Sequence, residues 1–241
     1  GLPALMHELG DKLDLSAITV TGRPLCDSLK EAPNYNQDVI RPLSNPVYPE
    51  GSLAVLKGNL APNGAVIKPA AMEPKFMRHR GPALVADSYN DLKQIINDPE
   101  ATITADHVLI LRNAGPQGGP GMPEWGMIPM PQRLLNEGHR DMVRLSDARM
   151  SGTSYGACIL HVSPEAFVGG PLALIKSGDM ISLDVPSRSL NVELTEDELA
   201  ERRAAWVQPK PRYQRGYGWI FSKHIEQADK GCDFDFLSTE F

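Results

Sequence analysis

The sequence predicts a mixed α/β fold in which a closed β-barrel carries flanking helices. Six short segments, rich in aliphatic residues and bounded by Gly, Pro, Asn or Asp, are typical of strands. They follow one another closely, and only a few helical patterns lie between them, which favours a sheet that closes on itself. The predicted strands lie within residues 52–58, 64–70, 81–87, 107–113, 180–186 and 189–195.

Capping signals predict the helices. Ser88 is a favoured N-cap for a helix over 88–96, and Thr195 with Glu198 three residues later forms a capping-box signature. Gly138 is a favoured residue just beyond a helix C-terminus. We expect helices over residues 1–15, 88–96, 132–137 and 195–206, and a weak helix over 220–228.

Three further stretches are less regular. Residues 17–22 indicate a short strand, and 24–49 a connector rich in Pro, Asn and Asp. Over 163–178 we expect two helical pieces, the first with Ser163 as its N-cap, divided by the Gly-Gly-Pro sequence at 169–171.

Charge and cysteine content exclude several classes of function. The 241 residues carry a formal net charge of −6, which argues against a nucleic-acid partner. No apolar run reaches the roughly 18 residues needed to span a bilayer, and no signal peptide opens the chain, so no membrane partner is expected. Cys26, Cys158 and Cys232 indicate neither a metal-ligand pair nor a disulfide framework. We therefore expect a cytoplasmic protein.

A glycine-rich segment over residues 112–127 is the first candidate functional region. Five glycines and three prolines occur in its sixteen positions, which allows its backbone to approach a ligand closely. Its spacing matches neither common nucleotide-binding loop. Glu124 is its one acidic residue, and a carboxylate on such a loop can bind a hard cation. A plain connector is the alternative.

Ser151 is the second candidate. It precedes Gly152 and the apolar segment 155–162, where we expect a helix N-terminus. A serine there can be a plain N-cap, or its oxygen can become a base whose negative charge the helix dipole stabilises. Residue type alone leaves both readings open. No G-x-S-x-G elbow surrounds Ser151, and nothing orients His161, so an esterase triad is poorly supported and His161 is expected in a strand or core.

Five long motifs resemble the dihydroxy-acid and sugar-acid dehydratases, over essentially the whole chain. They are GSLAVLKGNLAPNGAVIKPAAM (51–72), GPQGGPGMPEWGM (115–127), SDARMSGTSYGACILHVSPEA (146–166), GGPLALIKSGDMISLDVPSRSL (169–190) and LAERRAAW (199–206). The resemblance implies removal of water from a 2,3-dihydroxy acid to give a 2-keto-3-deoxy acid. It also implies a Mg²⁺ ion, a [2Fe–2S] cluster and a serine alkoxide that takes the C2 proton.

The resemblance assigns three site residues. Ser151 matches the general base, Thr153 in the same turn is expected to hydrogen-bond the alkoxide or the substrate, and Glu124 matches one Mg²⁺ ligand. In the family, the cluster cysteines and the other Mg²⁺ ligands, including a modified lysine, belong to an N-terminal domain. The three cysteines of this chain do not match those motifs, so the cluster-binding domain is expected as a partner.

The resemblance also implies the domain organisation. We expect the end of the N-terminal domain and a linker over 1–50, a swivelling β-barrel domain over 51–206, and a tail over 207–241 that docks on a neighbouring domain. A helical pattern starts at the first residue without an initiator Met, so we expect the polypeptide to be part of a longer one. On its own it is expected to be inactive.

Three functional readings remain. The motifs GMPEWGMIPMP and SDARMSGTSYG resemble the sugar-acid branch, which acts on aldonates such as arabinonate or xylonate. A dihydroxy-acid dehydratase of branched-chain amino-acid synthesis is the alternative within the family. A non-catalytic assembly module is the alternative for the isolated chain. The family further implies a homodimer or homotetramer when intact.

Overall fold

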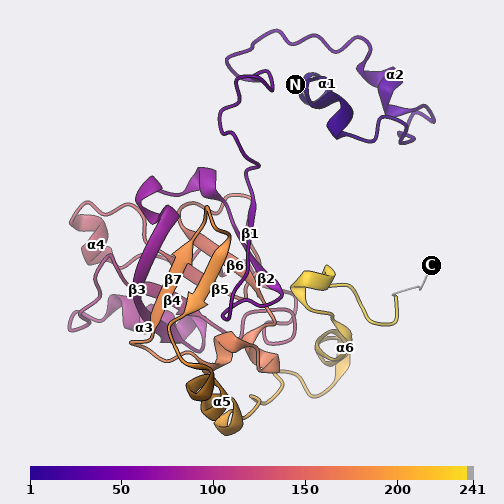
Figure 1. The fold of residues 1–241 in the computed structure, drawn as a ribbon. Helices are drawn as coiled ribbons and strands as arrows, with labels where there is room; N and C mark the ends of the chain where they lie inside the picture. Colours follow the sequence, from indigo (N-terminus) through magenta and orange to yellow (C-terminus); the bar gives the residue numbers. More distant parts are fainter. Residues whose placement is uncertain (238–241) are drawn as a thin grey trace. The chain divides into compact units, whose positions relative to one another are not determined.

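The computed structural model describes residues 1–237 and contains two compact units, Gly1–Gly51 and Ser52–Phe241 (Figure 1). The first unit holds helix α1 (Leu2–Leu9), a 3₁₀ turn (Gly10–Lys12) and helix α2 (Leu25–Leu29). The predicted opening helix is therefore confirmed. The strand predicted at 17–22 is wrong, because only an isolated bridge joins Ile18 to Pro24 around a turn.

The second unit is an eight-stranded sheet rolled into a barrel. Its strands lie in the order β1-β2-β6-β5-β4-β3-β7-β8, and the main chain of Lys57 joins the two ends. The Lys57 N–H donates to Arg188 O at 2.9 Å, and its carbonyl accepts from the Leu190 N–H at 2.9 Å. The strands are β1 (Ala54–Leu56), β2 (Gly64–Ile67), β3 (Arg78–Ala86), β4 (Val108–Leu111), β5 (Arg144–Ser146), β6 (Cys158–Ser163), β7 (Met180–Asp184) and β8 (Ser189–Val192). The predicted barrel and all six predicted strands are confirmed.

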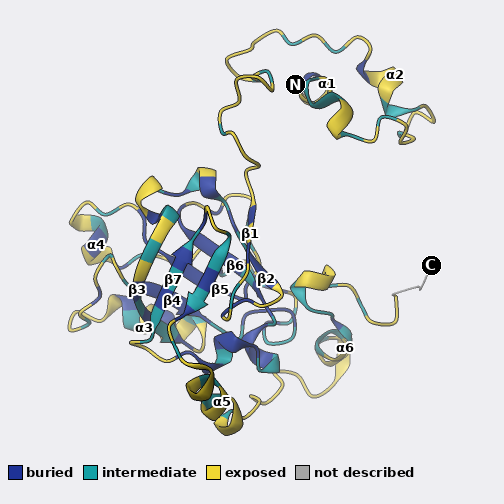
Figure 2. Cartoon of the chain, in the orientation of Figure 1, coloured by how far each residue is buried: buried dark blue, intermediate teal, exposed yellow. Residues whose placement is uncertain are grey.

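Strands β3 to β6 are parallel, and the other pairs are antiparallel. Strand β4 shows how this arrangement builds two cores, since all four of its residues are buried. Val108 and Ile110 belong to the apolar cluster that includes the inward residues of the other strands. Leu109 and Leu111 pack with Leu92 of helix α3 (Tyr89–Asn97) in a second cluster. Figure 2 shows that the strands are largely buried, whereas the outer helices such as α5 (Glu196–Ala205) are largely exposed.

The helices follow their capping signals. Helix α3 (Tyr89–Asn97) begins at Ser88, whose hydroxyl accepts from the Asp91 N–H at 3.2 Å. Helix α5 (Glu196–Ala205) has the predicted capping box between Thr195 and Glu198. Helix α4 (Gln132–Asn136) is confirmed, whereas the weak helix of the tail is α6 (Gly216–His224), displaced from its predicted range. No helix within residues 1–237 combines the length and apolarity needed to cross a membrane.

The prediction for residues 163–178 is partly wrong. Ser163 is the last residue of β6 and caps no helix, because its hydroxyl donates to Asp229 instead. Two 3₁₀ turns, Ala166–Val168 and Pro171–Leu174, replace the predicted helical pieces. The Gly-Gly-Pro sequence separates these turns as predicted. A last 3₁₀ turn, η6 (Ala228–Lys230), brings Asp229 of the C-terminal segment against β6.

Candidate active site

The parallel strands bring both candidate regions to one edge of the barrel. Leu111 at the end of β4 pairs with Ser146 at the end of β5. The glycine-rich segment follows β4, and the Ser151 segment follows β5. Because the carboxyl ends of neighbouring parallel strands meet at one edge, residues 112–127 and 147–157 leave the barrel side by side.

Two buried carboxyl groups hold the glycine-rich segment. Asp147 accepts backbone N–H bonds from Asn113 at 3.2 Å and from Ala114 at 2.9 Å. Glu165 accepts from the N–H groups of Gln117 and Gly118, each at 2.9 Å. Burial raises the pKa of the Asp147 carboxyl to about 7, and the charge of Glu165 adds to the rise. Burial also raises the pKa of Glu165.

Gly115 is required for this packing. A Cβ atom at this position would lie 2.7 Å from Oε2 and 2.8 Å from Cβ of Glu165. These separations are shorter than van der Waals contact, so the buried acid and the glycine-rich backbone can approach only without a side chain here.

Truncation of Glu165 should therefore destabilise the barrel. We expect Glu165→Ala to lower the free energy of unfolding by about 2 kcal/mol, because two partly buried N–H donors lose their acceptor. Urea unfolding at pH 7 measures the change. Glu193→Ala removes a carboxylate that pairs with Arg80 at the exposed surface, and it should have little effect. Equal effects of the two substitutions would contradict the assigned role.

Ser151 lies in a turn and caps no helix, which corrects the sequence-based expectation. The apolar segment that follows is strand β6, and no helix begins between β5 and β6. The Ser154 N–H donates to Ser151 O at 3.1 Å and closes the turn. The Ser151 hydroxyl accepts from the Thr153 N–H at 3.3 Å and lies 3.1 Å from Thr153 Oγ1. The N–H and the hydroxyl of Thr153, and no helix dipole, therefore face the Ser151 oxygen.

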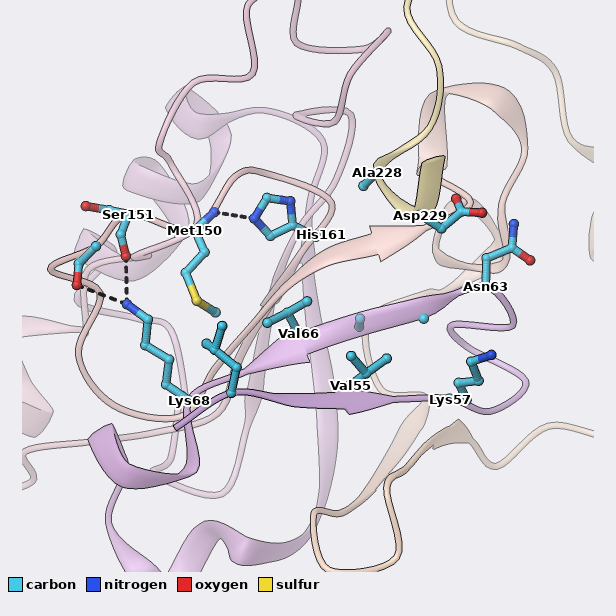
Figure 3. A pocket seen from close by; sticks show the side chains of 14 residues that line it. Val55, Lys57, Asn63, Val66, Lys68, Met150, Ser151, His161, Ala228 and Asp229 are labelled. Carbon is cyan, nitrogen blue, oxygen red and sulfur yellow. Dashed lines mark hydrogen bonds between the residues drawn. The ribbon is translucent and has the colours of Figure 1, made fainter. Parts of the chain in front are cut away.

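A cavity of about 680 Å³ opens beside Ser151 (Figure 3). Lys68 and His161 lie at the Ser151 end, and Lys57, Asn63 and Asp229 lie at the other end. Val55 and Val66 form an apolar floor between them. The cavity thus combines a hydroxyl group, cationic side chains and polar groups at both ends.

Glu124 is exposed on the neighbouring segment and forms an ion pair with Arg149, with 3.1 Å between Oε1 and Nη2. Arg149 precedes Ser151 by two residues, so this pair joins the two candidate segments. The structure thus brings Ser151 and Thr153 together, and it links Glu124 to them through Arg149 rather than by direct contact. In the described part of the chain, no three His, Cys, Asp or Glu residues are grouped to hold a metal ion.

Sequence reasoning missed Lys68, Asp147 and Glu165, and it gave His161 no role at the site. The Lys68 Nζ donates to Ser151 O at 2.9 Å and to Gly152 O at 3.0 Å. The Met150 N–H donates to Nε2 of His161 at 2.9 Å. The sequence gives only a weak indication of these roles, because Lys68 follows an apolar strand and His161 lies inside another. Only the pairing of β2 with β6 brings the two side chains to the Ser151 segment.

Residues 38–232 match the family described as dihydroxy-acid/6-phosphogluconate dehydratase C-terminal. The chain belongs to this dehydratase family. A 6-deoxy-6-sulfo-D-gluconate dehydratase of Pseudomonas putida is 52% identical over 99% of this chain. An L-arabonate dehydratase of Azospirillum brasilense is 47% identical over 98%, and a dihydroxy-acid dehydratase of Methanothrix thermoacetophila is 44% identical over 96%. The match covers 42% of the length of each of these three dehydratases.

Proposed function

We propose that this chain supplies the C-terminal part of the active site of a sugar-acid dehydratase, a hydro-lyase. The observation that carries the proposal is that Thr153 and Lys68 contact Ser151 beside a cavity with polar groups at both ends, while Glu124 pairs with Arg149 of the same segment. Relatives named for sulfogluconate and arabonate dehydration support the substrate class. The reaction removes the C2 proton and the C3 hydroxyl of an aldonate, and the resulting enol tautomerises to a 2-keto-3-deoxy acid.

Ser151 is the proposed base for the C2 proton. A serine hydroxyl is a very weak acid, so its ionised form needs donors and positive charge around it. Thr153 provides both an N–H and a hydroxyl near the Ser151 oxygen, and the Lys68 ammonium is hydrogen-bonded to the main chain of Ser151. After it has taken the proton, the neutral serine hydroxyl remains hydrogen-bonded to Thr153.

Glu124 is the proposed Mg²⁺ ligand of this chain. Its carboxylate is exposed, and carboxylate oxygen is a donor that Mg²⁺ prefers. One ligand does not complete a site, so the remaining ligands are assigned to an N-terminal partner domain. Mg²⁺ bound there would supply positive charge that acidifies the C2 proton of the substrate.

The described cysteines do not fit a [2Fe–2S] centre. Cys26 is exposed in the first unit, Cys158 is buried in β6 and Cys232 follows η6. Burial also raises the pKa of the Cys158 thiol, whereas cluster ligands are thiolates. We assign the cluster to the N-terminal partner domain and assign no step of this chain to it.

Removal of the Glu124 carboxylate should weaken Mg²⁺ binding. In the intact enzyme we expect Glu124→Gln to raise the Mg²⁺ concentration for half-maximal activity at least about tenfold, since a neutral amide is a poorer cation ligand. Glu137→Gln is the matched control, because Glu137 is also exposed and also pairs with an arginine. If Mg²⁺ affinity stayed the same in Glu124→Gln, Glu124 would be removed from the site.

Substrate choice tests the proposed function directly. The intact enzyme should turn over arabinonate or xylonate with a higher kcat/KM than dihydroxyisovalerate, because Lys57, Asn63 and Asp229 offer polar contacts at the far end of the cavity. Preference for dihydroxyisovalerate would instead support the branched-chain pathway. Absence of turnover for all three acids, with cluster and Mg²⁺ present, would favour a non-catalytic module.

A further inference from the structure

The main chain around Ser151 is held from both sides by neighbouring barrel strands. Lys68 follows β2 and donates to the carbonyls of Ser151 and Gly152 at 2.9 and 3.0 Å. His161 belongs to β6 and accepts from the Met150 N–H at 2.9 Å. These strands are paired, with Val66 opposite Leu160. Figure 3 shows the two side chains approaching the turn from different directions.

His161 makes a second contact with the same segment through its own backbone. Its N–H donates to Ala148 O at 3.0 Å, so one residue contacts both Ala148 and Met150. The φ angle of His161 is 55°, in the left-handed region that costs a residue with a side chain about 1 kcal/mol or more. The surrounding contacts hold this conformation, and it aims the imidazole at Met150.

Lys68 brings positive charge to a turn that has no helix dipole. Both of its hydrogen bonds go to carbonyl oxygens, so they do not neutralise the ammonium charge. The ammonium lies against the main chain of the residue that carries the hydroxyl. Positive potential at this distance favours the ionised form of a neighbouring oxygen acid.

We propose that Lys68 and His161 are positioning residues for Ser151, which together fix the Met150–Gly152 main chain while Lys68 adds positive potential at the hydroxyl. The catalytic part of this inference rests on the proposed role of Ser151 as base. The structural part, a two-sided clamp on one turn, does not.

The protonation state of His161 fits the clamp. Nε2 accepts a hydrogen bond, so it must be unprotonated, and burial together with the charge of Arg149 lowers the pKa of His161. The charged groups around the cavity are Lys57 on the β1 side, Lys68 on the β2 side and Asp229 in η6. The positive charge of Arg149 favours the neutral imidazole, and the carboxylate of Asp229 is hydrogen-bonded to Ser163.

Hydrogen exchange tests the clamp without an activity assay. In the 241-residue chain, we expect His161→Ala and Lys68→Met each to speed amide hydrogen exchange in residues 149–154 by about tenfold. This factor corresponds to the loss of one or two hydrogen bonds. His161→Gln keeps a hydrogen-bond acceptor and Lys68→Arg keeps a cation. The exchange rates of these two variants should therefore stay close to that of the parent. Lys57→Met changes a lysine of the same cavity that makes no contact with Ser151, so it is the control. Unchanged exchange in both His161→Ala and Lys68→Met would overturn the clamp.

Kinetics of the intact enzyme test the catalytic part. We expect Lys68→Met to lower kcat by about tenfold with KM altered less than roughly threefold. It should also raise the pKa of the ascending limb of the kcat profile, which reports the base that must be deprotonated. Lys68→Arg should restore both. If Lys68→Met left the pKa values of the kcat profile unchanged, the electrostatic role of Lys68 would be overturned. If Ser151→Ala remains active while exchange responds as predicted, the proposed function fails and the clamp stands.

Discussion

Ser151→Ala in the intact enzyme should lower kcat by at least about a hundredfold, because the C2 proton then lacks its base. KM should change less than roughly threefold, since the substitution removes one oxygen at the edge of a cavity of about 680 Å³. Formation of the 2-keto acid measures the rate, and equilibrium binding of the substrate gives an independent affinity. A large rise in KM with unchanged kcat would make Ser151 a substrate-binding residue instead.

Ser154→Ala is the matched control for this substitution. Ser154 lies in the same turn, and its hydroxyl is buried without a hydrogen-bond partner among the residues that the structure describes. Its removal should therefore leave kcat close to the parent value. If Ser154→Ala lost as much activity as Ser151→Ala, general disturbance of the turn would explain both, and the assignment of the base to Ser151 would fail.

The sequence predicts the parts of this fold that depend on local chemistry. Ser88 and Thr195 begin helices because a side-chain oxygen next to free N–H groups is a local arrangement. The six predicted strands are apolar segments between turn residues, which is also a local pattern. The two strands that were missed, β5 and β6, flank the Ser151 turn. The first is only three residues long, and the second follows a serine in a sequence that is equally typical of a helix start.

Three-dimensional pairing decides what local patterns cannot. Ser163 has the residue type of an N-cap, yet it ends β6, and its hydroxyl donates a hydrogen bond to Asp229 from a segment distant in sequence. In the same way, Ser151 was found through a resemblance, but its surroundings were not. A helix dipole was expected beside the Ser151 hydroxyl. The structure instead has the Lys68 ammonium and the Thr153 hydroxyl there. Lys68 follows β2 and His161 lies in β6, so only the pairing of these two strands brings both side chains to the Ser151 turn.

Asp147 should make the stability of the chain depend on pH with an unusual sign. Burial raises the pKa of this carboxyl from 3.8 to about 7 in the folded state. The folded protein therefore binds a proton more tightly than the unfolded chain does. The resulting stabilisation is complete below about pH 4 and is lost as pH rises through about 7, by an amount on the order of 4 kcal/mol.

Asp147→Asn isolates this contribution, because the amide does not titrate. Urea unfolding should show the stability advantage of the parent over Asp147→Asn shrinking from pH 5 to pH 8. The lowered pKa of His161 contributes with the opposite sign over the same range, but it contributes to both proteins and cancels in their difference.

Asp179→Asn provides the contrasting control. Burial opposes ionisation of Asp179, but the hydrogen bond and charge of Arg202 hold its pKa below the usual value, so its contribution changes only at lower pH. The difference in free energy of unfolding between Asp179→Asn and the parent should stay constant from pH 5 to pH 8. A constant gap for Asp147→Asn as well would mean that Asp147 is already ionised in the folded protein at pH 5. Three backbone donors, from Asn113, Ala114 and Ala166, would then outweigh burial and the charge of Glu165.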